Sequence, residues 1–384
     1  MANDAPILLD VTRLIWRRWD GRHPTGVDRV CLAYLEHFKG KAQAVVQHRR
    51  MRRILDRETS QALFDLLSDS GASFRKRLVS GALSRGLRRG CEGRGRIYLN
   101  LGHTGLNDAG FREWLRTVDV RPVFFVHDLI PITHPEFCRP AEEFKHRERM
   151  RTVLQTAAGV IANSKATLDA LAAFAETEAL VLPPTIASLL GADAFPTTVS
   201  GSASGPTNFI MLGTIEGRKN HLMLLQVWSR MAARLGRDAP RLTVIGKRGW
   251  ECEQALDLLD RSPALRGVVD EIAHCDDAEL ARHLAQARAL LFPSLAEGYG
   301  LPLVEALGSN VPVIASDLPV FREIAGNVPE YLDPLDGPAW ERTILNYATP
   351  NSPERQSQMK RIKRFRPPTW DDHLEKVESW LRTI

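Results

Sequence analysis

The chain has 384 residues, of which 44% are hydrophobic and 25% charged, and its formal net charge is +5. This length suggests two domains of ordinary size, and the composition is that of a globular protein. No apolar run approaches a membrane span and the N-terminus lacks the pattern of a signal peptide, so we expect a cytoplasmic protein.

Five cysteines are scattered along the chain without a C-x-x-C pair or a cysteine–histidine cluster. They are Cys31, Cys91, Cys138, Cys252 and Cys275. An odd, dispersed set of this kind argues against a disulfide framework and against a structural zinc site. We therefore expect reduced thiols and no metal centre.

Apolar runs of strand length alternate with helix-like segments through the first half of the chain. Residues 12–25, which are rich in arginine and tryptophan, are predicted to form a loop after the first strand. The order of elements predicts a doubly wound parallel sheet. We predict strands at 7–11, 44–47, 97–101, 122–126, 159–162 and 180–182, and helices at 26–38, 141–158 and 165–174.

Basic residues concentrate between Arg49 and Arg96, where thirteen arginines and lysines accompany five acids. Such a surface could meet anionic lipid headgroups, a diphosphate-linked acceptor or nucleic acid, or it could simply be solvated. Nucleic acid is the least favoured partner, because no base-stacking aromatic residues are interleaved with the charges. The sequence leaves open whether residues 68–96 are ordered.

A segment rich in Gly, Ser and Pro near the midpoint predicts a linker, after which the alternation of strands and helices resumes. The expected domains are 1–195, a linker at 196–207, a second domain at 208–366 and a C-terminal helix at 367–384. Within the second half we predict strands at 209–213, 242–245, 268–272, 289–293 and 311–315, and helices at 221–235, 251–260, 278–287, from 302 onward and at 370–384.

Two carboxylates flank the strand-to-helix turn in the sequence EGYGLPLVE, which runs from Glu297 to Glu305. Pro302 predicts the first position of a helix, which puts Glu297 on the loop and Glu305 about one turn inside the helix. Gly298 and Gly300 let a ligand approach the backbone, and the free amides of the helix start favour an anion. Since open α/β sheets bind ligands at the carboxyl ends of their strands, the turn predicts a site for a hydroxylated, negatively charged ligand. A plain turn with a capped helix is the alternative.

The order of residue types from Glu297 to Glu305 resembles the Glu-x7-Glu motif of retaining glycosyltransferases of family 4, and residues 311–326 continue the resemblance. The resemblance implies the GT-B architecture, in which two Rossmann-like domains face a central cleft. The N-terminal domain would bind the acceptor, the C-terminal domain the nucleotide sugar, and the last helix would pack back on the N-terminal domain. Residues 10–13 and 25–29 look most like bacterial mannosyltransferase-type enzymes of surface polysaccharide or O-antigen synthesis.

The resemblance also implies roles for residues of the second domain. Arg218 and Lys219 are similar to the family's cation pair, which binds the donor diphosphate where negative charge builds on the leaving group. Glu297 would bind hydroxyls of the donor sugar and Glu305 those of the ribose, and both are expected to be catalytic. Further contacts with the nucleotide or sugar are expected at Gly246, Lys247, Gly298, Tyr299, Gly300 and Leu301.

In the first domain, His127 follows a predicted strand, as does the His-Asp segment of family 4 enzymes. The resemblance implies that His127 orients or polarises the donor from the wall opposite Glu297, whereas a structural histidine is the alternative reading. Gly26, in a turn that only weakly matches the family, would lie beside the donor phosphates. Candidates on the acceptor side are Arg13, Trp16 and Asp128.

These observations predict transfer of a hexose with retention of configuration, without metal or cofactor other than the nucleotide-sugar co-substrate. GDP-mannose is the first choice of donor, and the expected acceptor is a growing, lipid-linked glycan at the inner face of the plasma membrane. A UDP-sugar donor, a nucleotide-sugar 2-epimerase of the same fold and a non-catalytic binding subunit are the alternatives.

Overall fold

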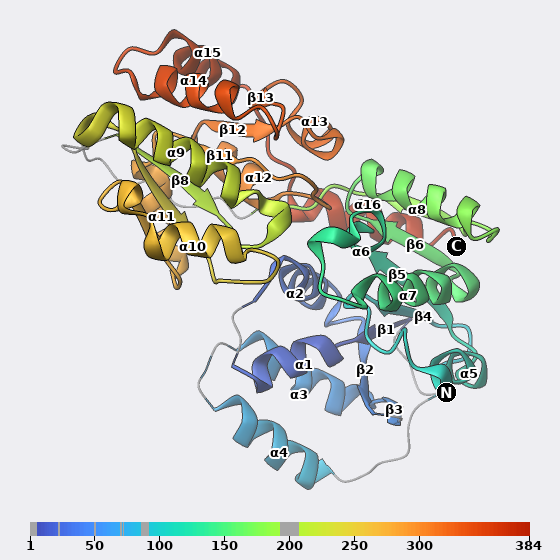
Figure 1. Cartoon of the computed structure of the whole chain (residues 1–384). Coiled ribbons are helices and arrows are strands. Elements are labelled where there is room, and N and C mark those ends of the chain that lie inside the picture. The colour runs from blue at the N-terminus through green and yellow to red at the C-terminus, as the bar shows by residue number, and fades with distance from the viewer. Residues whose placement is uncertain are drawn as a thin grey trace. The chain divides into compact units, whose positions relative to one another are not determined.

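A computed structural model describes residues 6–21, 24–49, 51–69, 71, 73–85, 92–192 and 207–384 of the chain. Contacts divide the chain into two units (Figure 1). Unit 1 comprises Met1–Leu129, Phe144–Leu190 and Trp370–Ile384, and unit 2 comprises Ile130–Glu143 and Gly191–Thr369. The chain therefore crosses from one unit to the other at several places, whereas two domains joined by a single linker would need one crossing. Nearly all of the predicted linker at 196–207 lies outside the described residues.

Unit 1 is built on a seven-stranded sheet in the order β3-β2-β1-β4-β5-β6-β7. All neighbouring strands are parallel except β2 and β3, which form an antiparallel pair. The strands are β1 (Ile7–Asp10), β2 (Ala42–His48), β3 (Met51–Ile54), β4 (Ile97–Asn100), β5 (Arg121–Val126), β6 (Gly159–Ala162) and β7 (Thr185–Ala187). The helices of this unit are α1 (Thr12–Trp19), α2 (Gly26–Phe38), α3 (Arg57–Ser68), α4 (Phe74–Arg85), α5 (Ala109–Val118), α7 (Glu142–Thr156), α8 (Lys165–Thr177) and α16 (Trp370–Leu381).

The predicted loop at 12–25 is wrong, because its first part forms helix α1. The helix begins where the amide of Thr12 donates to Asp10 Oδ1 at 3.0 Å, and it buries Leu14. Its arginines Arg13 and Arg17 form ion pairs with Asp28 on α2, at 2.6 and 2.9 Å. These contacts join residues more than ten positions apart, so the local pattern of polar residues did not reveal the helix.

The strand predicted at 180–182 is also wrong, because the last strand of the sheet is β7, a few residues later. Residues 183 and 184 are prolines, which cannot donate to a strand ladder. The pairing with β6 accordingly starts at the carbonyl of Pro184, which accepts from the amide of Val160 at 2.9 Å. The sheet also differs from the predicted parallel sheet at one edge, where strand β3 follows β2 in an antiparallel hairpin.

Unit 2 contains a six-stranded sheet in the order β10-β9-β8-β11-β12-β13, with every pair parallel. The strands are β8 (Asn208–Leu212), β9 (Arg241–Ile245), β10 (Val269–Ile272), β11 (Leu290–Phe292), β12 (Val313–Ser316) and β13 (Glu330–Leu332). The main helices are α9 (His221–Leu235), α10 (Glu253–Arg261), α11 (Asp277–Gln286), α12 (Leu301–Gly308), α13 (Pro319–Ala325), α14 (Gly337–Ala348) and α15 (Pro353–Ile362). The short helices α6 (Ile130–Thr133) and η1 (Pro135–Phe137) also belong to this unit. The predicted α/β fold class of two parallel-sheet domains is confirmed.

The strand order of each sheet reverses direction at one place, which is called the switch point of the sheet. In unit 1 the reversal lies between β1 and β4, and in unit 2 between β8 and β11. Doubly wound sheets bind ligands in the crevice outside the carboxyl ends of the strands at such a point. The segments that follow these four strands are therefore where a site is expected.

The last helix, α16, belongs to unit 1. His373 Nε2 lies 2.8 Å from the hydroxyl of Tyr34 on α2, and Glu378 pairs with Lys41 at 2.6 Å. Gly159 on β6 lies against Trp380, because a Cβ there would come within 2.6 Å of the indole ring. The C-terminal segment thus completes a unit that begins at the opposite end of the chain.

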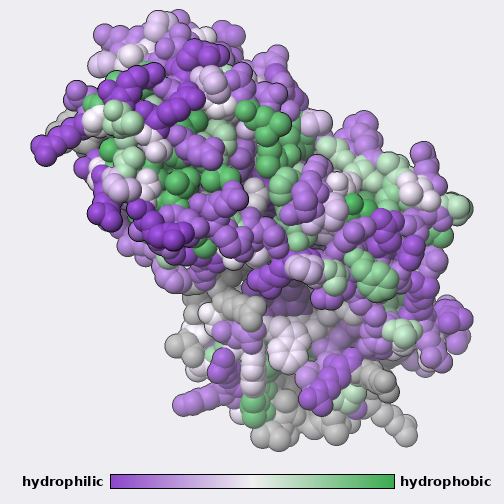
Figure 2. Space-filling view, in the orientation of Figure 1, coloured by the Kyte–Doolittle hydropathy of each residue, from purple (hydrophilic) through white to green (hydrophobic). Residues whose placement is uncertain are grey.

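Most of the surface shown in Figure 2 is hydrophilic, with smaller hydrophobic areas between the charged side chains. In the described part of the chain, no helix is both long and apolar enough to cross a membrane.

Candidate functional site

The loop after β8 carries the two predicted cations of unit 2. Gly213 leaves the strand at φ +130, a value that side chains other than glycine rarely adopt. Residues Gly217–Lys219 then form a short 3-10 turn, and Asn220 adopts a left-handed conformation just before α9. This path brings Arg218 and Lys219 to the carboxyl end of β8, beside the strand β11.

Glu297, on the loop after β11, pairs with both cations. Its Oε2 lies 2.7 Å from Arg218 Nη1, and its Oε1 accepts from Lys219 Nζ and, at 2.8 Å, from the hydroxyl of Ser294. Burial by itself would raise the pKa of this carboxyl, but Arg218, Lys219 and the hydrogen bonds outweigh it and lower the pKa of Glu297 to about 2. Glu297 is therefore ionised throughout the physiological range.

Glu216 is a second buried carboxylate of this cluster, and it was not among the residues predicted from the sequence. Its Oε1 lies 2.7 Å from Arg218 Nη2, so the guanidinium of Arg218 bridges Glu216 and Glu297. Burial raises the pKa of Glu216, and the neighbouring cations oppose that rise. An acid two positions before a cation pair was the only signal available in the sequence.

The four charged side chains form what we call the charge cluster: Glu216, Arg218, Lys219 and Glu297. The ammonium of Lys219 also lies 4.8 Å from the centre of the Phe292 ring, a cation–π distance. Two cations held at the switch point of the sheet can receive a diphosphate, and an ionised carboxylate between them can accept hydrogen bonds from hydroxyls.

The turn from Glu297 leads into α12, which begins at Leu301, one residue before the Pro302 that the sequence predicts as the first helical position. Gly300 takes φ +116 at the N-cap, and a Cβ there would come within 2.7 Å of the ring of Phe321. Tyr299 and Leu301 beside it are buried, and Gly298 is half-buried. Glu305 lies inside α12 with only 4% of its surface exposed. A carboxylate so enclosed must be held by hydrogen bonds, so Glu305 is part of the interior of this turn.

The loop after β9 lies against the loop after β8. A Cβ on Gly246 would fall 1.9 Å from the carbonyl oxygen of Gly213, so glycine is required at position 246 by the contact between the two backbones. Lys247, the next residue, is exposed. Trp250 donates from Nε1 to the carbonyl of Phe137 at 3.2 Å, and the guanidinium of Arg139 lies 4.8 Å from its ring centre. Trp250 thus holds the segment Ile130–Glu143 within unit 2.

In unit 1, His127 lies just past β5 and is buried. Its Nε2 is 2.7 Å from the carbonyl oxygen of Leu101, which can only accept, so Nε2 carries the proton and Nδ1 is the acceptor. Burial lowers the pKa of His127 to about 4. Asn163 donates to its backbone carbonyl at 2.8 Å. The imidazole is therefore neutral and oriented at pH 7.

Two further histidines, which no sequence pattern predicted, continue from His127: His103 lies next to it and His146 lies next to His103. The ring of His103 lies 5.5 Å from that of His127 and 5.8 Å from that of His146, centre to centre. His103 follows β4, while His146 is on α7 and lies 3.1 Å from the carbonyl of Asp128. Within the described ranges, no group of three or more His, Cys, Asp or Glu side chains is arranged to hold a metal ion.

The remaining predicted residues of unit 1 come from α1, from the start of α2 and from the segment after β5. Gly26 is the first residue of this helix, and Asp28 closes a capping box with Thr25. Arg13 donates to Asp28 at 2.6 Å, so part of its charge is already neutralised. Trp16 is 43% exposed on α1, and Asp128 is half-buried after His127. These residues belong to unit 1 and the charge cluster belongs to unit 2, so each unit has a candidate site of its own.

A comparison with protein families matches residues 198–328 to the family "Glycosyl transferases group 1". The chain is 32% identical over 228 residues to the serotype-specific mannosyltransferase WbdA of Escherichia coli. This alignment covers 55% of this chain and 28% of WbdA. It is 33% identical over 136 residues to the O-antigen chain mannosyltransferase B of Escherichia coli, over 35% of each chain. The chain thus spans about a third or less of the length of these relatives.

Solved structures share the fold over nearly the whole chain. A sucrose-phosphate synthase from Thermosynechococcus elongatus aligns with a TM-score of 0.65 at 15% identity, covering 98% of both chains. HepE of Anabaena, solved in complex with UDP and glucose, aligns with a TM-score of 0.68 at 12% identity, covering 98% of this chain and 99% of that one. These neighbours are GT-B glycosyltransferases, so the predicted GT-B fold is confirmed.

Proposed function

Since the chain contains a group 1 glycosyl transferase domain at residues 198–328, we propose that it transfers a hexose from a nucleotide sugar to a growing glycan of a bacterial surface polysaccharide. The observation that carries this proposal is the charge cluster at the switch point of the second sheet, inside that domain. The relatives named as O-antigen mannosyltransferases support mannose as the sugar, and GDP-mannose is the donor we propose.

In the proposed reaction, the donor diphosphate binds Arg218 and Lys219, whose positive charge stabilises the leaving group as the glycosidic bond breaks. Glu297 then accepts hydrogen bonds from hydroxyls of the donor sugar, and Glu305 holds the ribose. The neutral imidazole of His127 orients the donor sugar, and Arg13, Trp16 and Asp128 belong to the acceptor side. The departing diphosphate takes the proton of the acceptor hydroxyl on the same face, so the configuration is retained and no metal is required.

We further propose that the acceptor is carried by a lipid and that the enzyme works at the inner face of the membrane. The support for this step is the excess of basic residues between Arg49 and Arg96, which suits an anionic partner.

The first test is thermal unfolding of the purified protein with GDP, UDP or ADP in the presence of a chelator. A ligand at about 100 times its dissociation constant adds roughly 2.7 kcal/mol to the folded state, which shifts the Tm of a domain of this size by several degrees. We expect GDP to stabilise the protein selectively. Lys219→Ala should abolish the shift, while Arg248→Ala, which removes an exposed arginine paired with Asp260 and Glu271, should keep it.

Stabilisation that requires added Mg²⁺ would contradict the metal-independent mechanism. No shift with any nucleotide would contradict the donor site itself. Selective stabilisation by UDP would keep the enzyme class and replace the donor.

A further inference from the structure

A cavity of about 460 Å³ lies in unit 1 between α1, the end of β2, the start of β3 and α4. Figure 1 shows α1 and α4 in blue tones on the same side of unit 1. The cavity walls are mainly apolar and aromatic. They are formed by Ile15, Trp16, Trp19, Val46, Met51 and Leu78.

Two polar side chains of the lining, Thr12 and Gln47, already have hydrogen-bonding partners within the protein. Thr12 Oγ1 accepts a hydrogen bond from the backbone amide of Gln47 at 2.8 Å. The side chain of Gln47 accepts from Arg52 Nε at 3.1 Å and donates to the hydroxyl of Tyr98 at 3.1 Å. A ligand in this cavity would therefore find apolar surface and few hydrogen-bonding partners, so an apolar chain fits it best.

The mouth of the cavity leaves large apolar side chains in contact with water. Met51 is 59% exposed and Trp16 is 43% exposed, with the Trp16 ring 5.4 Å from that of His48. Apolar side chains gathered at the opening of an apolar cavity indicate a surface that is covered when its ligand is present.

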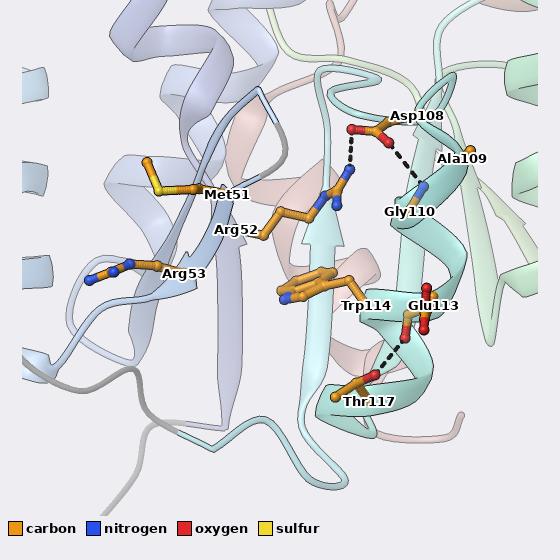
Figure 3. A pocket seen from close by; sticks show the side chains of 9 residues that line it. All are labelled: Met51, Arg52, Arg53, Asp108, Ala109, Gly110, Glu113, Trp114 and Thr117. Atoms are coloured by element: carbon orange, nitrogen blue, oxygen red, sulfur yellow. Dashed lines mark hydrogen bonds and ion pairs between the residues drawn. The ribbon is translucent and has the colours of Figure 1, made fainter.

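One cation, Arg53, lines this cavity, because side chains alternate along the short strand β3. Arg52 points toward α5, where it pairs with Asp108 at 2.6 Å, while Met51 and Arg53 point to the other side of the strand (Figure 3). Arg53 lines the cavity, is only partly exposed, and pairs with no acid among the residues that the structure describes.

We propose that the cavity binds the apolar chain of an anionic lipid, with its phosphate-type headgroup on Arg53 at the mouth. The apolar walls and the unpaired cation at their edge together select an amphiphilic anion rather than a neutral lipid or a free anion. Such a lipid has two sources, a membrane phospholipid or the lipid carrier of the acceptor, and the second source rests on the proposed function.

The test measures binding by calorimetry with decyl phosphate below its micelle concentration, which combines a chain with an anionic head. Inorganic phosphate supplies the anionic head without a chain, and decyl glucoside supplies the same chain with an uncharged head. We expect saturable binding of decyl phosphate at one site, at least tenfold tighter than that of either partial probe. Equal affinity for decyl phosphate and inorganic phosphate, or no binding of decyl phosphate, would overturn the proposal.

Three variants locate the binding in this cavity. Arg53→Gln should weaken decyl phosphate about tenfold, Arg53→Lys should restore most of that loss, and Leu78→Asn, in the wall, should weaken both decyl probes. Leu335→Asn, at an apolar residue of unit 2 that is 77% exposed, is the matched control and should change nothing. Thermal unfolding of each variant confirms that it folds. Unchanged affinity in folded Arg53→Gln and Leu78→Asn would overturn the assignment to the cavity.

The two sources are separated with farnesyl diphosphate and dihexanoyl phosphatidylglycerol as competitors of decyl phosphate. Stronger competition by farnesyl diphosphate assigns the cavity to the carrier of the acceptor, and stronger competition by the phospholipid assigns it to the membrane. Failure of both would overturn the proposal. Stabilisation by GDP reports on unit 2 and is read separately, so failure of the lipid site and failure of the proposed function are distinguishable.

Discussion

At the scale of single residues, Glu297 is the counter-ion of the two cations that the proposed reaction assigns to the donor diphosphate. Its side chain is only 7% exposed, and its pKa falls from an ordinary 4.5 to about 2. A depressed carboxyl pKa stabilises the folded state above the unfolded pKa, and this stabilisation is lost as the pH falls through the folded pKa. The contribution of Glu297 is therefore complete above pH 4.5 and decreases from there toward pH 2.

We expect Glu297→Gln to lower the free energy of unfolding at pH 7 by about 3 kcal/mol, which is what the shift in pKa corresponds to. The difference in the free energy of unfolding between the variant and the wild type should become smaller below pH 4.5. Denaturant unfolding at a series of pH values measures it. A difference that stays constant from pH 7 to pH 3 would show that Glu297 stabilises the fold by something other than its charge. Transfer should be lost in this variant at every pH.

At the scale of elements, the donor loop depends on the close approach of the segments that follow β8 and β9. Gly246→Ala would put a Cβ 1.9 Å from the carbonyl of Gly213, and backbone cannot move aside as cheaply as a side chain. We expect this variant to cost at least the 1–3 kcal/mol typical of overpacking, and to weaken nucleotide stabilisation because it displaces the turn that carries Lys219.

The matched control is Gly337→Ala at the start of α14, where a new Cβ would lie 3.6 Å from Val227, an ordinary contact. This change should be neutral or slightly stabilising, since alanine restricts the unfolded chain. The measurement is the Tm of both variants with and without GDP. If Gly246→Ala kept the wild-type shift, the loop contact would not position the cations.

At the scale of the whole molecule, chain order and contacts do not coincide, because α16 belongs to unit 1 and Ile130–Glu143 belongs to unit 2. Val377 of α16 is completely buried, so Val377→Asp would bury a charge without a partner. We expect it to destabilise unit 1 by several kcal/mol and to leave unit 2 folded, with the nucleotide shift retained. Limited proteolysis followed by mass spectrometry would show cleavage confined to unit 1. Loss of nucleotide stabilisation would mean that unit 2 does not fold without an intact unit 1.

The sequence by itself determined what short segments decide through their own conformational limits and neighbours. The strands β8 to β12, the glycine turn before Pro302 and the cation pair after β8 are all local features, and their places along the chain were predicted closely. The same holds for Gly26 at the start of α2. Backbone preference, side-chain period and helix termination act over a few residues, so a pattern can show them.

Only the tertiary structure decided the features that depend on residues far apart in the chain. Glu297 lies 78 positions from Lys219, and nothing in either segment shows that the two side chains form an ion pair. The helix α1, the row of His127, His103 and His146, and the reason for Gly246 likewise follow from contacts between different elements. Burial and ion pairing are set by which elements meet in space, and that information is distributed over the whole chain rather than written in any one segment.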